Sequence, residues 1–196
     1  MEKEAERFEA IIYIKVGTHA GETIDEIISR KQGEEKRAGL FFWGHGSGML
    51  NPSTRVIPFV EESRHRGIMP KVLMHIMYRN SGKNYSSNSH IAQYYSIDNK
   101  NWKPIPKGIL VTGSKYALVC KNLRKVETFI DLGMYKVANG KGKGMLLNSY
   151  IRYRVDRACA FLKDPLPEDL ARSDTTVEIS YVTDLVEPYA VFLKGG

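Results

Sequence analysis

Ala10-Ile-Ile-Tyr-Ile-Lys-Val16 predicts a buried strand near the start of the chain, because a β-branched, apolar run of this length is typical of one. It is followed by residues 21–31, in which three isoleucines recur at helical spacing. The short apolar segment Gly39-Leu-Phe-Phe-Trp-Gly44 comes next. This order predicts a strand, a helix and a second strand, which is a βαβ-like opening.

The predicted helix has clear end signals. Thr23 and Glu26 have the spacing of a capping box, and Gly33 followed by the charged residues 34–37 predicts the exit loop. A second, short helix is expected around residues 57–63. The apolar residues between 145 and 162 also recur at helical spacing, and they predict a third helix that ends at Asp164-Pro-Leu-Pro167.

The rest of the chain favours strands. We expect them at residues 71–78, at 91–97 and 102–105 as a hairpin, at 108–113, at 115–119, and at 176–183 and 189–193 as a terminal hairpin. The polar residues 79–90 predict a surface loop. Together these patterns predict one α+β domain over residues 1–196, in which two or three helices flank a mixed, curved sheet or partial barrel.

Bulk composition is that of a folded protein, with 42% hydrophobic and 26% charged residues. No apolar run approaches the ~20 residues of a membrane helix, and the acidic start lacks the pattern of a signal peptide. We therefore expect a soluble protein that stays in the cytoplasm and does not bind membranes. Cys120 and Cys159 lie in apolar stretches without a CxxC motif, which predicts two buried, reduced thiols.

Charge is unevenly distributed along the chain. Residues 63–157 contain 18 Lys and Arg but only four acidic residues, whereas residues 1–62 contain 8 basic and 11 acidic residues. A local balance of +14 predicts an anionic partner rich in phosphate, such as a nucleotide or a nucleic acid. The sequence leaves homo-oligomerisation open.

The first candidate site is the turn Gly140-Lys-Gly-Lys-Gly144, which precedes the predicted third helix. Glycine lets a backbone approach a phosphate, and a helix start offers free N–H groups. The turn lacks the Walker A spacing, and the alternative is an ordinary solvated turn. The candidate ligand-binding residues here are Lys141, Lys143, Asn148, Arg154 and Arg157.

Arg152 also lies in this segment. It stands four residues before Asp156, so the two are expected to form a surface ion pair. This pairing makes Arg154 and Arg157 the better ligand candidates.

The second candidate site follows the second predicted strand, where Trp43, His45 and Ser47 alternate with glycines and Asn51 and Arg55 come shortly after. An aromatic ring can stack on a base while the polar groups bond to its edge. The alternative for Trp43 is simple core packing. Ser47 is not in a Gly-x-Ser-x-Gly motif, so a serine hydrolase is not indicated.

Two weaker candidates lie further along the chain. Arg79 and Lys83 occur in the polar segment 79–90, which is either a loop that closes over a ligand or an ordinary connector. Lys115 follows a Thr-Gly turn at the start of a predicted strand. The five histidines show no metal-ligand spacing, so neither a metal nor a cofactor is expected.

These observations favour non-enzymatic binding of a nucleotide, one that is read or sequestered, or of a nucleic acid, at a basic site lined by aromatic residues. One alternative is an enzyme acting on a nucleotide or nucleic acid, with His45 as its acid–base group. The other is a basic interaction protein or inhibitor that binds an acidic protein.

Overall fold

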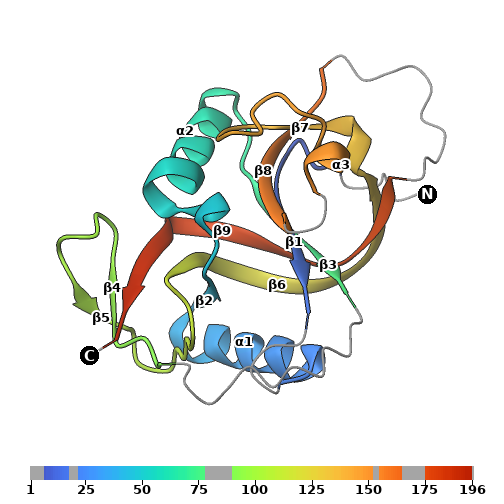
Figure 1. Cartoon of the computed structure of the whole chain (residues 1–196). Coiled ribbons are helices and arrows are strands. Elements are labelled where there is room, and N and C mark those ends of the chain that lie inside the picture. Colours follow the sequence, from blue (N-terminus) through green and yellow to red (C-terminus); the bar gives the residue numbers. More distant parts are fainter. Residues whose placement is uncertain (1–6, 18–21, 78–89, 152–154, 165–174, 196) are drawn as a thin grey trace.

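The computed structural model describes residues 7–17, 22–77, 90–151, 155–164 and 175–195. Within them, a mixed sheet of nine strands and three α-helices form an α+β fold, and the sheet is not closed into a barrel (Figure 1). The helices are α1 (Ile24–Ala38), α2 (Ile57–His65) and α3 (Leu147–Tyr150). The strands are β1 (Ala10–Val16), β2 (Phe41–His45), β3 (Lys71–Ile76), β4 (Tyr94–Ser96), β5 (Lys103–Pro104), β6 (Tyr116–Asp131), β7 (Tyr135–Val137), β8 (Arg157–Leu162) and β9 (Thr176–Lys194).

The strands lie in the order β2-β6-β9-β3-β1-β8-β7, and β4 joins β9 on one side and β5 on the other. The pair β1–β3 is parallel, and the remaining pairs are antiparallel. The predicted order of the first three elements, a strand, a helix and a strand, is confirmed. However, β2 pairs with β6 at the edge of the sheet, so the parallel neighbour of β1 is β3.

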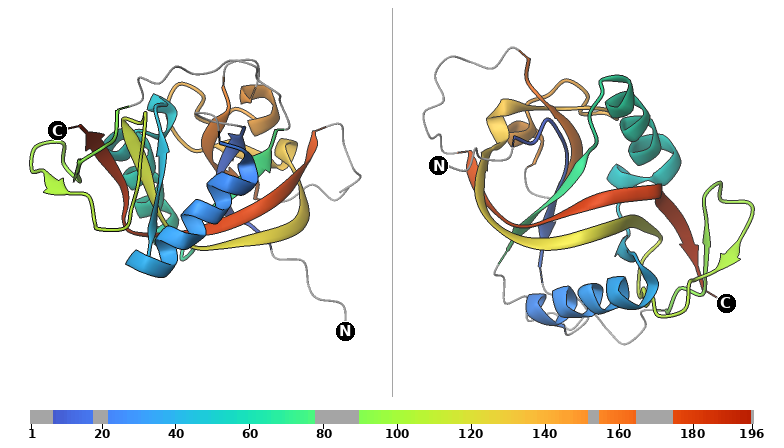
Figure 2. Two further views of the ribbon diagram at one scale, coloured as in Figure 1. Left: turned by 90° about the horizontal axis from the view of Figure 1, so that it is seen from below. Right: turned by 180° about the vertical axis from the view of Figure 1, so that it is seen from behind.

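Two long strands, β6 and β9, curve across the molecule, with α1 along one side and α2 and α3 on the other (Figures 1 and 2). Their pairing shifts register at three places, for example where Leu118 pairs with Ala190 but Cys120 pairs with Leu185. Such bulges bend a strand and increase its twist. The sheet is therefore curved, as the sequence predicts.

Two strand predictions in this region are wrong. The terminal hairpin is instead the single strand β9, which continues through the irregularity between Leu185 and Ala190 and pairs along its length with β6. The expected strand at 108–113 is an irregular segment whose pairing is one isolated bridge between Ile91 and Thr112. Its backbone bonds to α1 side chains instead of forming a ladder.

The predicted helix over residues 145–162 is also wrong. Of the described residues in this segment, only the four of α3 are helical, and Arg157–Leu162 form β8, which lies between β1 and β7. The four central residues of β8 are all buried. A strand buried on both faces is continuously apolar, and such a run also satisfies a helical spacing.

The helix α1 extends beyond the predicted exit loop and ends at Gly39, whose φ is 78°. The capping box is confirmed: the Glu26 amide donates to Thr23 Oγ1 at 3.3 Å, and the Thr23 amide donates to Glu26 Oε2 at 2.7 Å. Residues 34–37 remain helical because the Glu34 side chain is buried against Lys31 and because Lys36 and Arg37 suit the helix C-terminus.

Several shorter predictions are confirmed, namely α2, β3 and the β4–β5 hairpin. The sheet is buried on both faces at β1, where Ile12 and Ile14 face one core cluster and Ile11 and Tyr13 face another. Both cysteines are free and buried, as predicted. Among the described helices, none has the length and apolar character needed to cross a membrane.

Candidate functional site

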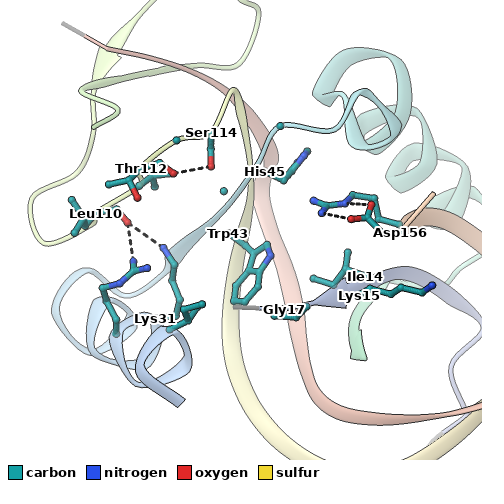
Figure 3. Close-up of a pocket in the computed structure, with 18 residues that line it drawn as sticks. Ile14, Lys15, Gly17, Lys31, Trp43, His45, Leu110, Thr112, Ser114 and Asp156 are labelled. Carbon is teal, nitrogen blue, oxygen red and sulfur yellow. Dashed lines mark hydrogen bonds and ion pairs between the residues drawn. The ribbon is translucent and has the colours of Figure 1, made fainter. Parts of the chain in front are cut away.

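A cavity of about 430 Å³ lies between β1, β2, α1, the irregular segment before β6 and the start of β8 (Figure 3). We call it the β2 cavity. It is lined by Ile14, Lys15, Val16, Gly17, Ile27, Arg30, Lys31, Trp43, Gly44, His45, Gly46, Leu110, Val111, Thr112, Gly113, Ser114, Asp156 and Arg157.

Trp43 and His45 reach the β2 cavity because they alternate with Gly44 along β2 and so share one face of the strand. Gly44 allows the neighbouring segment to approach closely. A Cβ atom at this position would lie 2.5 Å from Ser114 Oγ and 2.6 Å from a Val111 methyl carbon. The glycine is therefore required for the wall of the cavity to form.

Trp43 belongs to the main core cluster and also lines the β2 cavity. Its indole lies between Lys31 on one side and Ile14 and Asp156 on the other (Figure 3). Only 8% of the residue is exposed. The two interpretations of Trp43, core packing and a ligand contact, are thus compatible.

His45 is 5% exposed, and neither of its ring nitrogens has a hydrogen-bond partner. Its ring lies 5.6 Å from that of Tyr116, centroid to centroid. Burial, followed by the nearby charge of Arg157, lowers the pKa of His45 to about 3, while the Ser47 backbone and the charge of Asp156 act in the opposite direction. The imidazole is therefore neutral at physiological pH, with one N–H donor and one acceptor nitrogen. The Ser47 backbone lies close to the ring, but neither nitrogen makes a hydrogen bond of normal distance and angle with the part of the chain that the structure describes.

One wall of the β2 cavity is an ion-pair network on α1. Lys31 Nζ donates to both carboxylate oxygens of Glu34, at 3.3 and 3.1 Å, and to the Leu110 carbonyl at 3.2 Å. Arg30 bonds to Glu22, Glu34 and the same carbonyl. All three donors of Lys31 are used. Because Arg30 and Lys31 both bond to the Leu110 carbonyl, this wall holds the segment around Leu110 in place.

The opposite wall contains Asp156 and Arg157, adjacent residues at the start of β8. Arg157 Nε and Nη2 donate to Asp156 Oδ1 and Oδ2 at 2.8 and 3.0 Å. Burial raises the pKa of Asp156, but its bonds to Arg157 and the charges of Arg157 and Lys15 outweigh this and lower the pKa overall. The predicted pairing with Arg152 concerns a residue outside the described part of the chain.

The structure brings together three of the predicted site residues, Trp43, His45 and Arg157, in the β2 cavity. Ser47 and Asn51 follow on the chain but cap short helical turns. Ser47 Oγ accepts a bond from the Met49 amide at 3.2 Å, and Asn51 Oδ1 accepts bonds from the amides of Ser53 and Thr54 at 3.1 Å. Arg55, Lys115, Lys141, Lys143 and Asn148 do not line the cavity, and Arg79, Lys83 and Arg154 lie outside the described residues.

The glycine turn at 140–144 differs from its prediction because no long helix starts there. The amides of Lys143 and Gly144 donate to the carbonyls of Gly140 and Val137 at 3.1 and 2.9 Å. Arg55 packs over Gly140, where a Cβ atom would lie 2.8 Å from the Arg55 Nε atom. The helix-start argument for a phosphate site at this turn therefore no longer holds.

The sequence did not indicate the cavity residues Arg30, Lys31, Thr112 and Asp156. Arg30 and Lys31 fall in the acidic N-terminal part of the chain, outside the basic block formed by residues 63–157. Ser114 directly precedes Lys115 and lines the cavity, where its hydroxyl donates to the Thr112 carbonyl at 3.2 Å. Only the tertiary arrangement shows that these residues share a site.

Among the described residues, no group of three or more His, Cys, Asp and Glu side chains has an arrangement that holds a metal ion. Comparison of the chain with models of protein families, with curated proteins and with solved structures finds no match.

Proposed function

We propose that the protein binds a small nucleotide in the β2 cavity, with the base against Trp43 and His45 and the phosphate at Arg157. The observation that carries the proposal is the pair of unpartnered ring nitrogens on buried His45. Leaving a buried polar group without a partner costs about 1–3 kcal/mol, and a ligand that bonds to the ring removes this cost.

The size of the cavity supports a small ligand. A volume of about 430 Å³ falls in the lower part of the roughly 300–1,000 Å³ range of small-molecule sites. A strand of nucleic acid needs an extended groove instead. The pocket version of the nucleotide hypothesis is therefore better supported than the groove version.

The charge of the lining supports an anionic ligand. Four basic residues, Lys15, Arg30, Lys31 and Arg157, and one acidic residue, Asp156, line the cavity. Arg30 and Lys31 are occupied by Glu22 and Glu34, and Lys15 extends away from Trp43 in Figure 3. Arg157 is also paired, but the side chain of its partner Asp156 is 44% exposed and, among the described residues, its carboxylate bonds to no other side chain, so Arg157 is the cation best placed to meet a phosphate.

Binding without chemical change is favoured over catalysis at His45. A general base works best when its pKa lies near the working pH. The pKa of His45 is lowered to about 3, so the ring is a weak proton acceptor near neutrality. This supports a role in recognition of the ligand.

The test is isothermal titration of the purified protein with adenosine 5′-monophosphate and guanosine 5′-monophosphate. His45→Ala should weaken binding of the preferred nucleotide by about tenfold or more, because two ligand bonds are lost. The matched control is His65→Ala, which removes an exposed histidine from α2. Equal binding by wild type and His45→Ala would contradict the proposal. Mass spectrometry of the ligand after incubation should show it unchanged.

A further inference from the structure

The guanidinium proposed to hold the phosphate is already occupied by a carboxylate. Arg157 presents Nε and Nη2 to the two oxygens of Asp156 at 2.8 and 3.0 Å. This two-point geometry is the one with which arginine also binds a phosphate. A ligand phosphate that uses the same edge of Arg157 must therefore replace the Asp156 carboxylate.

The two side chains differ in their exposure to water. The Arg157 side chain is 17% exposed, whereas that of Asp156 is 44% exposed. The backbone of Asp156 is fixed, because its carbonyl accepts a bond from the Lys15 amide at 2.9 Å. Rotation of the Asp156 side chain alone can thus move the carboxylate into solvent while Arg157 remains in the cavity wall.

Lys31, the other buried cation of the cavity, offers no equivalent place for the anion. Lys31 is 4% exposed, and its three donors all bond to Glu34 and the Leu110 carbonyl. Displacing Glu34 would also release the Leu110 amide, which donates to the same carboxylate at 3.2 Å. Replacing the Asp156 carboxylate by a phosphate at Arg157 disturbs fewer contacts than displacing Glu34 from Lys31.

We infer that Asp156 is an internal counterion that competes with the ligand for Arg157, and that the site consequently selects a phosphomonoester over a phosphodiester. This inference rests on the proposed function. A phosphomonoester carries about −1.5 to −2 charges at pH 7, whereas a diester carries one, the same as the carboxylate that it must displace. The doubly charged group therefore competes better against Asp156.

The first experiment compares two ligands on the unmodified protein. Adenosine 5′-monophosphate and adenosine 3′,5′-cyclic monophosphate are titrated at pH 8, together with the corresponding guanosine pair. The monoester of the preferred base should bind about tenfold more tightly than its cyclic diester. Equal or tighter binding of the diester would overturn the inference without affecting the proposed function.

The second experiment removes the competitor. Asp156→Asn should bind the monoester at least about threefold more tightly than wild type, because the amide no longer competes as an anion. The control is Asp164→Asn, which makes the same charge change at an exposed residue outside the cavity lining and should leave the affinity nearly unchanged. Weaker binding by Asp156→Asn would mean that Asp156 instead positions Arg157, which overturns the inference.

These measurements separate nucleotide binding at His45 from competition by Asp156. If no nucleotide binds, or if binding does not depend on His45, the proposed function is wrong and the inference fails with it. If binding depends on His45 but the diester is preferred, or if Asp156→Asn does not tighten binding, the inference that Asp156 competes for Arg157 is wrong. The proposed nucleotide site then still stands. Thermal unfolding of each variant shows whether it is folded before its affinity is compared.

Discussion

At the scale of the residue, His45 is a side chain that stability alone does not explain. Among the described residues, Tyr13 Oη and Asn148 Oδ1 are also buried without a partner, but neither residue lines the β2 cavity. The ring of His45 is buried in the wall of the β2 cavity, and neither nitrogen has a partner. A leucine of similar volume would fill the same space without unmet hydrogen bonds. Retention of a destabilising polar group is typical of sites where function and stability conflict.

We therefore expect His45→Leu to raise the free energy of unfolding of the ligand-free protein by about 1 kcal/mol, while nucleotide binding is lost. Urea unfolding monitored by circular dichroism measures this change. His65→Leu on the exposed side of α2 is the control, and its effect should lie within about 0.5 kcal/mol. A destabilised His45→Leu would show that the ring has a structural partner.

The same residue predicts how stability depends on pH. Because the pKa of His45 is about 3 in the folded protein and 6.5 when unperturbed, the unfolded chain binds more protons between these values. Ionisation of His45 therefore costs no stability above pH 6.5. As the pH falls from 6.5 toward 3, the free energy of unfolding decreases by up to about 1.4 kcal/mol per pH unit. The difference in unfolding free energy between wild type and His45→Leu, measured from pH 7 to pH 4.5, should follow this slope. A difference independent of pH would be inconsistent with a buried neutral ring.

Gly44 in β2 and Gly46 just after it allow the cost of a steric clash to be measured separately from the effect of reduced backbone freedom. Gly44→Ala places a Cβ atom 2.5 Å from Ser114 Oγ, so we expect a loss of about 1–3 kcal/mol of stability and a distorted cavity. Gly46→Ala is the matched control, since no atom lies within 4 Å of its added Cβ. Similar unfolding midpoints for the two variants would argue against close packing at Gly44.

At the scale of the element, α1 both covers the core and holds one wall of the cavity. Glu34 is fully buried and bonds to Lys31, Arg30 and the Leu110 amide. It therefore links the helix to a segment some 76 residues away in the chain. A buried carboxylate that neutralises a buried lysine is costly to remove.

Glu34→Ala should destabilise the protein by about 3–5 kcal/mol, because it leaves the Lys31 ammonium buried and unpaired. Chemical denaturation provides the measurement. The exposed Glu61 on α2 supplies the comparison, and its replacement by alanine should change stability by about 0.5 kcal/mol or less. A small effect of Glu34→Ala would mean that water reaches Lys31.

Elements with local signals were predictable, and elements made by tertiary pairing were not. The capping box of α1 and the β-branched, apolar run of β1 are visible in the sequence and are confirmed. The helix expected over residues 145–162 failed because β8 is buried on both faces between β1 and β7. An apolar run of this kind fits a strand and a helix equally well.

At the scale of the whole molecule, the β2 cavity is assembled from segments that are far apart in the chain. Trp43 and His45 could be predicted as a pair because they share one motif, and Arg157 because of its charge. Asp156, Lys31 and the segment around Leu110 could not, since only the order of strands in the sheet brings β8 and α1 to the same cavity. Most of the basic block lies elsewhere and is not explained by this site.

Nitrogen-15 NMR of the histidine side chains tests most directly whether His45 binds a ligand with its ring nitrogens. Titration with the nucleoside monophosphates should shift both ring resonances of His45 saturably, with one nucleotide bound per chain, while those of His65 stay constant. Ring resonances of His45 that do not move up to millimolar concentrations of both adenine and guanine nucleotides would contradict nucleotide binding at His45.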